Sequence, residues 1–137
     1  MIKLNDFLSI LLLLINISFL LFYSLQLLIF TDEFAVKNIG SFNHAIAGLS
    51  EIIGIIFLCL SIGLFSIFFL GPKNHTSLLI TIFFTEFIIS INFWRYVFTN
   101  SPGESNLKII SINASIFLLM SIMMIFLIFR LKMIKQQ

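Results

Sequence analysis

The sequence predicts an all-α, polytopic membrane protein: a left-handed bundle of four transmembrane helices with both termini in the cytoplasm. Two observations predict this fold class. Hydrophobic residues make up 60% of the 137 residues and charged residues 10%, with a mean hydropathy of +1.14, whereas soluble domains are about half apolar and about a quarter charged. The chain also contains four apolar runs, each near the roughly 20 residues that a helix needs to cross a ~30 Å hydrocarbon core.

The four predicted helices cover residues 7–30, 45–70, 77–98 and 109–129. The segments between them are polar, and Gly71-Pro72 and Pro102-Gly103 are strong helix stops. The first run is longer than the apolar part of a typical signal peptide, and no small-x-small cleavage site follows it. We therefore expect it to be retained, so that residues 1–137 form a single membrane domain.

The distribution of lysine and arginine predicts the orientation. If the N-terminus is cytoplasmic, that side carries Lys3, Lys73, Arg130, Lys132 and Lys135, and the outer side carries Lys37, Arg95 and Lys108. Cytoplasmic segments carry the excess of such cations, so both termini are expected inside, in the inner or plasma membrane of a cell. A net charge of +2 is too small for nucleic-acid binding. The expected partners are the lipid bilayer and either a second membrane protein or further copies of the chain.

Polar side chains inside the apolar runs predict a ligand site near the outer face. The candidate ligand-binding residues are Glu51, Arg95, His44, Asn92, Tyr23 and Asn113. At 1.5 Å per residue, each lies within about 10 Å of the outer end of its helix. We expect Glu51 to be the acid or acceptor, Arg95 to hold an anion in its planar fork, and the others to orient the ligand. The alternative is structural: Glu51 and Arg95 neutralise each other, and the amides join the helices.

Spacings of three and four residues predict which face of each helix points inward. On the second helix the stripe is His44, Ala47, Glu51, Gly54, Leu58 and Ser61, and on the third it is Thr81, Thr85, Ile88, Asn92 and Arg95. On the first helix the stripe is Ser9, Asn16, Tyr23 and Gln26, and on the fourth it is Asn113, Phe117 and Met120.

Glu86 is a second candidate site, near the centre of the bilayer and on the opposite face of its helix from Arg95. Ionisable residues at this depth are costly and are functional hypotheses by default. Glu86 could carry protons or contact a second subunit. The alternative is a neutral carboxyl that is hydrogen-bonded to Asn16 at similar depth.

Several of these residues resemble a motif of the MAPEG family, the membrane glutathione transferases and related eicosanoid enzymes. That family has a basic residue on its second helix, then Asn four residues later and Glu three after that; here His44, Gly48 and Glu51 occupy these positions. Arg95-Tyr96 and Lys108 resemble the family's basic and tyrosine residues around the third and fourth helices. The resemblance implies a homotrimer that binds glutathione or a lipid.

The sequence contains no recognisable catalytic motif, and we expect no catalytic residue, cofactor or metal. Cys59 is a single cysteine, and no Cys/His spacing suggests a metal site. The first functional hypothesis is therefore an accessory subunit or a lipid- or small-molecule-binding bundle with an outer-leaflet polar cluster. The second is a MAPEG-like membrane enzyme that acts on a lipid or conjugates glutathione. The third is a proton-coupled carrier that works as an oligomer.

Overall fold

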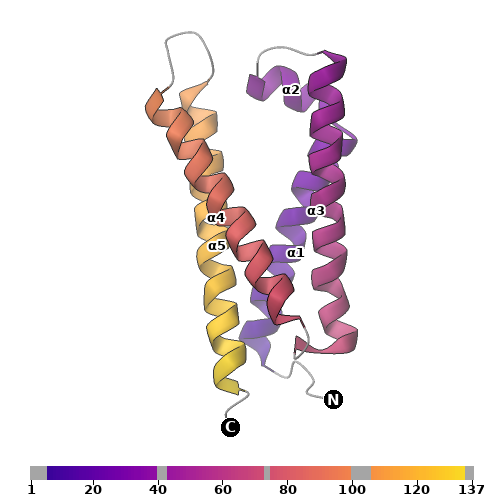
Figure 1. Cartoon of the computed structure of the whole chain (residues 1–137), viewed down its shortest axis with the longest axis vertical. Helices are drawn as coiled ribbons and strands as arrows, with labels where there is room; N and C mark the ends of the chain where they lie inside the picture. The colour runs from indigo at the N-terminus through magenta and orange to yellow at the C-terminus, as the bar shows by residue number, and fades with distance from the viewer. Residues whose placement is uncertain (1–5, 40–42, 73–74, 100–105, 135–137) are drawn as a thin grey trace.

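The computed structural model describes residues 6–39, 43–72, 75–99 and 106–134, and within them the chain forms helices and no strands. The helices are α1 (Phe7–Leu28), α2 (Thr31–Ile39), α3 (His44–Leu70), α4 (Thr76–Thr99) and α5 (Leu107–Ile134). All but α2 are long and apolar enough to cross a membrane, which confirms the predicted four-helix membrane bundle. Figure 1 shows the start of α1 and the end of α5 at one end of the bundle, here called the terminal end; the opposite end is the distal end.

α2 is a short helix in a polar segment where the sequence predicts no helix. Asp32 and Glu33 occupy its first turn, where the positive end of the helix dipole favours acidic side chains. Thr31 Oγ1 donates to the carbonyl oxygen of Leu27 over 2.6 Å, and Ala35 is fully buried. Figure 1 shows α2 at the distal end, inclined to α3. It lies in the connection between α1 and α3 and contacts both helices.

Side-chain caps and a glycine define the helix boundaries. Asp6 caps α1 by accepting a hydrogen bond from the backbone N–H of Ser9, and Asn43 caps α3 in the same way for Ile46. α3 ends at Gly71, whose φ of 80° is a conformation that other residues rarely adopt. The predicted stop at Gly71-Pro72 is therefore confirmed. The other predicted stop, Pro102-Gly103, lies outside the described residues.

The long helices pack as two pairs, α1 with α3 and α4 with α5, and the pairs meet mainly through α1 and α5. A Cβ atom at Gly54 would lie 2.8 Å from Leu28 Cγ and 3.0 Å from Leu27 Cβ, so this glycine lets α3 approach α1 closely. α3 and α4 touch through few residues. The seam between α3 and α4 is thus much less packed than the interface within either helix pair.

Two polar contacts define the register of α1 against α5. Tyr23 is bonded to Asn113, and Asp6 is bonded to Arg130. Asp6 and Tyr23 are seventeen residues apart, as are Asn113 and Arg130. The two helices therefore run antiparallel without slippage over about 25 Å, at 1.5 Å per residue.

The buried faces of α1 and α5 agree with the predicted stripes, whereas the stripe on α4 was wrong. Ser9, Asn16 and Tyr23 on α1 and Phe117 and Met120 on α5 are buried. On α4 the buried residues are Leu79, Ile82, Glu86 and Ser90, and the predicted inward residues Ile88, Asn92 and Arg95 are exposed.

Local hydrogen bonds explain why the threonines on α4 did not mark the inward face. Thr81 and Thr85 donate their hydroxyls to carbonyl oxygens one turn back on the same helix, so neither hydroxyl needs a partner on another helix. Ser90 Oγ instead donates across the helix pair to the carbonyl oxygen of Ala114 over 2.8 Å. Contact with α5 therefore selects the Glu86 and Ser90 face.

The predicted stripe on α3 is correct in part. The buried residues of α3 are Ser50, Gly54, Phe57, Ser61, Leu64 and Ile67. Gly54 and Ser61 belong to the predicted stripe, but its first residues, His44 and Glu51, are exposed. The inward face passes through Ser50, next to Glu51, because Gly54 and Phe57 pack against α1 and the interior.

Candidate functional site

An aromatic cluster fills the interior of the distal half and draws on all four long helices. It consists of Phe19 and Tyr23 from α1, Phe57 from α3, Phe93 from α4 and Phe117 from α5. The centroid of the Phe117 ring lies 5.0 Å from that of Phe19, 4.9 Å from that of Tyr23 and 5.8 Å from that of Phe93. These are favourable separations for tilted and edge-to-face rings.

Tyr23 gives the aromatic cluster a polar edge. Its hydroxyl donates to Asn113 Oδ1 over 2.8 Å. Both residues belong to the predicted ligand-binding set, so the structure brings these two together as the sequence placed them, at one depth on α1 and α5. Tyr23 is buried and Asn113 is half-buried. The bond satisfies a phenol and an amide that apolar surroundings would otherwise leave unpaired.

The other four predicted ligand-binding residues are Glu51, Arg95, His44 and Asn92, and they lie exposed in the distal halves of α3 and α4. Arg95 Cζ lies 4.9 Å from the centroid of the neighbouring Tyr96 ring, within the range of a cation–π contact. An exposed arginine near a helix end can extend its guanidinium to the headgroups.

The structure does not form the predicted Glu51–Arg95 pair within one chain. Across the described residues, the ion pair that forms joins Asp6 to Arg130. Glu51 and Arg95 lie on α3 and α4, which contact each other sparsely, and both side chains are exposed. Because they are not buried together, neither needs the other for neutralisation.

The Asp6–Arg130 pair is a polar contact that the sequence analysis missed. Arg130 Nη2 donates to Asp6 Oδ1 over 2.8 Å, and Arg130 Nε donates to Asp6 Oδ2. This bidentate arrangement ties the start of α1 to the end of α5. The Arg130 guanidinium beside Asp6 holds the pKa of that carboxyl well below its usual range, with help from the Ser9 hydroxyl. Both residues flank apolar runs at the terminal end, but their pairing depends on the relative register of α1 and α5.

Glu86 and Asn16 lie fully buried in the middle of the bundle. Both carboxyl oxygens of Glu86 and the Oδ1 atom of Asn16 have no hydrogen-bond partner. The predicted hydrogen bond between these two residues is therefore not formed. Asn16 instead donates from Nδ2 to the carbonyl oxygen of Leu12 over 2.9 Å. Buried acceptors without donors are rare in proteins, which makes this the second candidate site of the bundle.

The geometry thus offers two places where chemistry can occur. The distal half has an apolar, aromatic interior with one polar edge and with charged residues on its outer surface. The centre has buried oxygen acceptors. In the described ranges, no group of three His, Cys, Asp or Glu side chains could hold a metal ion. No protein-family model matches the chain, and no similar curated protein or solved structure is found.

Proposed function

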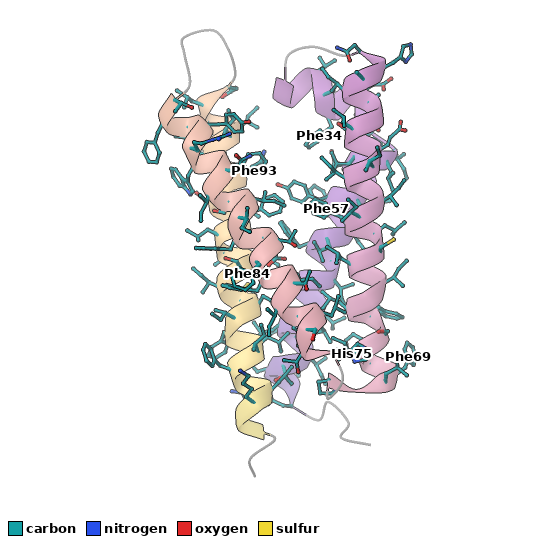
Figure 2. The ribbon with its side chains drawn as sticks, in the orientation of Figure 1. Phe34, Phe57, Phe69, His75, Phe84 and Phe93 are labelled. Carbon is teal, nitrogen blue, oxygen red and sulfur yellow. The ribbon has the colours of Figure 1, made fainter. Side chains whose placement is uncertain are left out.

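We propose that the chain is a non-enzymatic membrane protein that binds the apolar tail of a lipid or a similar amphiphile at the seam between α3 and α4. The observation that carries the proposal is the sparse contact between these two helices directly beside the aromatic cluster. Figure 2 shows Phe57 on the side of α3 that faces the α4–α5 pair, with Phe93 in the same distal half.

The seam supports entry of a lipid tail from the bilayer. In a membrane, helices associate through packing and hydrogen bonds, because lipid tails are as apolar as the side chains. A loosely packed seam can therefore exchange helix contacts for lipid contacts at small cost. Figure 1 shows the ribbons of α3 and α4 close together near the terminal end and separating toward the distal end. The aromatic cluster includes Phe57 of α3 and Phe93 of α4, so we place the tail beside these residues, in the distal part of the seam.

The residues around the seam fit the two parts of an amphiphile. Phe93 is half-buried, so part of its ring is available to a ligand tail, while Phe57, which contacts the same Phe117 ring, is buried. Asn92 and Arg95 are exposed near the distal end of the same helix. An arginine fork matches the geometry of phosphate and carboxylate groups. We therefore assign the tail to Phe93 and Phe57, and an anionic headgroup to Arg95.

Native mass spectrometry of the full chain released from lipid vesicles with mild detergent tests the proposal. The wild type is expected to retain a lipid that Phe93→Ala loses, because the variant removes the ring at the seam. Phe84→Ala is the matched control: Phe84 is on the same helix but is 51% exposed and takes no part in the aromatic cluster. Equal retention by both variants, or a wild type without lipid, would contradict the proposal. Circular dichroism confirms that each variant keeps its helices.

The same measurement separates the alternatives. A trimer that carries glutathione would favour the MAPEG-like enzyme, with Glu51, Arg95 and Tyr96 exposed to a neighbouring copy. A second protein in fixed ratio would favour an accessory subunit.

A further inference from the structure

The centre of the bundle contains more hydrogen-bond acceptors than donors. Glu86 is 0% exposed, and neither of its carboxyl oxygens has a partner; Asn16 is also 0% exposed, and its Oδ1 has none. Most donors in this part of the bundle are bonded to backbone carbonyl oxygens; the buried hydroxyl of Ser24, about 12 Å along α1 from Asn16, has no partner. The amide of Asn16 donates to Leu12, the hydroxyl of Ser90 donates to Ala114, and that of Ser121 donates to Leu118.

The helix register places these acceptors at one depth. Tyr23 on α1 is bonded to Asn113 on antiparallel α5. Seven residues from this bond toward the terminal end, α1 has Asn16 and α5 has Met120, so Asn16 is level with Met120. On the other side, Ser90 is bonded to Ala114, and Glu86, four residues earlier, is level with Leu118. Two residues of α5 span about 3 Å. Because α1 and α4 both pack on α5, Asn16 and Glu86 flank the same level of the interior.

No cationic side chain of the described residues neutralises Glu86. On α5, Lys108 and Arg130 are ten and twelve residues from Leu118, which is at least about 15 Å along the helix. On α1 the titratable group is Tyr23, which is bonded to Asn113. The remaining titratable groups on the membrane helices are exposed: His44, Glu51 and Cys59 on α3, Arg95 and Tyr96 on α4, and Lys132 on α5. An uncompensated carboxylate in such surroundings costs several kcal/mol.

We propose that Glu86 and Asn16 form a mid-membrane binding site for one small monovalent cation, either a proton or Na⁺. Both ions share the chemistry that the site offers, which is coordination by oxygen acceptors. A proton forms a covalent bond to one Glu86 oxygen, neutralises the carboxylate and can then be donated toward Asn16 Oδ1. Na⁺ would instead bind the carboxylate and the amide oxygen directly, with no covalent bond formed. The site is independent of the lipid seam, because it uses neither Phe93 nor Arg95.

Infrared spectroscopy of the full chain in lipid vesicles tests this site, because a protonated carboxyl has a C=O band separate from the amide bands. In the proton case, the wild type at neutral pH shows this band, and transfer to D₂O shifts it. In the sodium case, the band is absent in Na⁺ and appears when choline replaces Na⁺. Glu86→Gln, which is nearly isosteric, should remove the band. The exposed Glu51→Gln is the matched control and should leave it unchanged.

A second variant keeps the test independent of Glu86→Gln. Asn16→Ala removes the amide acceptor, so in the proton case the C=O band should move to higher frequency. In the sodium case, the Na⁺ concentration that halves the band should rise at least tenfold. The proposal is overturned by a band that never exchanges with D₂O and ignores Na⁺, which would indicate a sealed structural carboxyl. It is also overturned by a band that is absent in both salts, or by an Asn16→Ala variant that behaves like the wild type.

Discussion

The hydroxyl of Tyr23 is the polar group that joins α1 to α5 in the distal half. Tyr23→Phe removes this hydroxyl and leaves the aromatic cluster intact, since the ring remains. We expect the variant to lose about 0.5–1.5 kcal/mol of unfolding free energy, the net contribution of a typical hydrogen bond. The measurement is equilibrium unfolding in mixed detergent micelles. Tyr96→Phe is the control, because Tyr96 is 47% exposed, and it should change stability little. Equal losses in the two variants would show that the Asn113 bond does not stabilise the bundle.

Asp6 gives the bundle a pH dependence at the terminal end. Its pKa is held below the usual range by the hydrogen bonds from Arg130. Such a carboxyl stabilises the fold above its unfolded pKa of about 3.9, and this contribution is lost as pH falls toward the lower folded pKa. The wild type should therefore lose stability below about pH 4.

Asp6→Asn tests this dependence, because asparagine can still cap α1 but carries no charge. The difference in unfolding free energy between wild type and variant should be largest at neutral pH and shrink below about pH 4. Subtracting the unfolding free energy of the variant from that of the wild type at each pH separates the contribution of Asp6 from those of the exposed acids. A difference that stays constant down to pH 2 would mean that the Arg130 contact contributes no charge-dependent stability.

Among the elements, the α1–α3 pair depends on one close approach. Gly54→Ala places a methyl group 3.0 Å from Leu27 Cβ and 2.8 Å from Leu28 Cγ, so the helices must shift. We expect a loss of about 1–3 kcal/mol, as is typical of overpacking. Gly48→Ala is the matched control on the same helix, because its added methyl group meets nothing within 4 Å. Equal stabilities of the two variants, measured by unfolding in mixed micelles, would contradict this account of the pair.

The sequence predicted the helices that are apolar and long enough to transfer favourably into lipid. The four long helices follow from apolar length alone. α2 does not, since hydropathy gives no sign of a short polar helix; the cue was Thr31 followed by Asp32 and Glu33. The face of each helix that points inward was harder still to predict. On α4, both faces carry polar residues, and a threonine can satisfy its own hydroxyl locally, so spacing could not reveal that Glu86 rather than Asn92 faces α5.

The candidate sites likewise contain some residues whose positions the sequence predicted and others whose positions it did not. Tyr23 and Asn113 were predicted in the same outer polar layer, because the depth of each along its helix can be read from the sequence; their bond to each other was not predicted. Glu51 and Arg95 were not placeable, since a charged side chain near a helix end can face the interior or extend to the headgroups at similar cost. The Asp6–Arg130 pair needed the relative register of the first and last helices, which no local pattern contains.

For the whole molecule, the structure places the start of α1 and the end of α5 at one end, and the cations predict that this end is cytoplasmic. A fluorescent protein fused after Gln137 should therefore fluoresce, and alkaline phosphatase fused there should be inactive. The same phosphatase fused after Thr99, at the distal end of α4, should be active, because that enzyme requires export. The reverse pattern of activities would invert the orientation and place the terminal end outside.

The register between α1 and α5 also fixes a length. The Asp6–Arg130 and Tyr23–Asn113 bonds stand about 25 Å apart along the helices, somewhat less than the ~30 Å hydrocarbon thickness of an average bilayer. Because Tyr23 is buried and its hydroxyl is paired with Asn113, this bond can lie within the hydrocarbon without leaving an unpaired polar group. The two bonds hold α1 and α5 at a fixed offset, so the two helices cannot slide past each other to fit a bilayer of different thickness. They can only tilt together, or the surrounding lipid must adjust, at a cost of fractions of a kcal/mol per Å of mismatch.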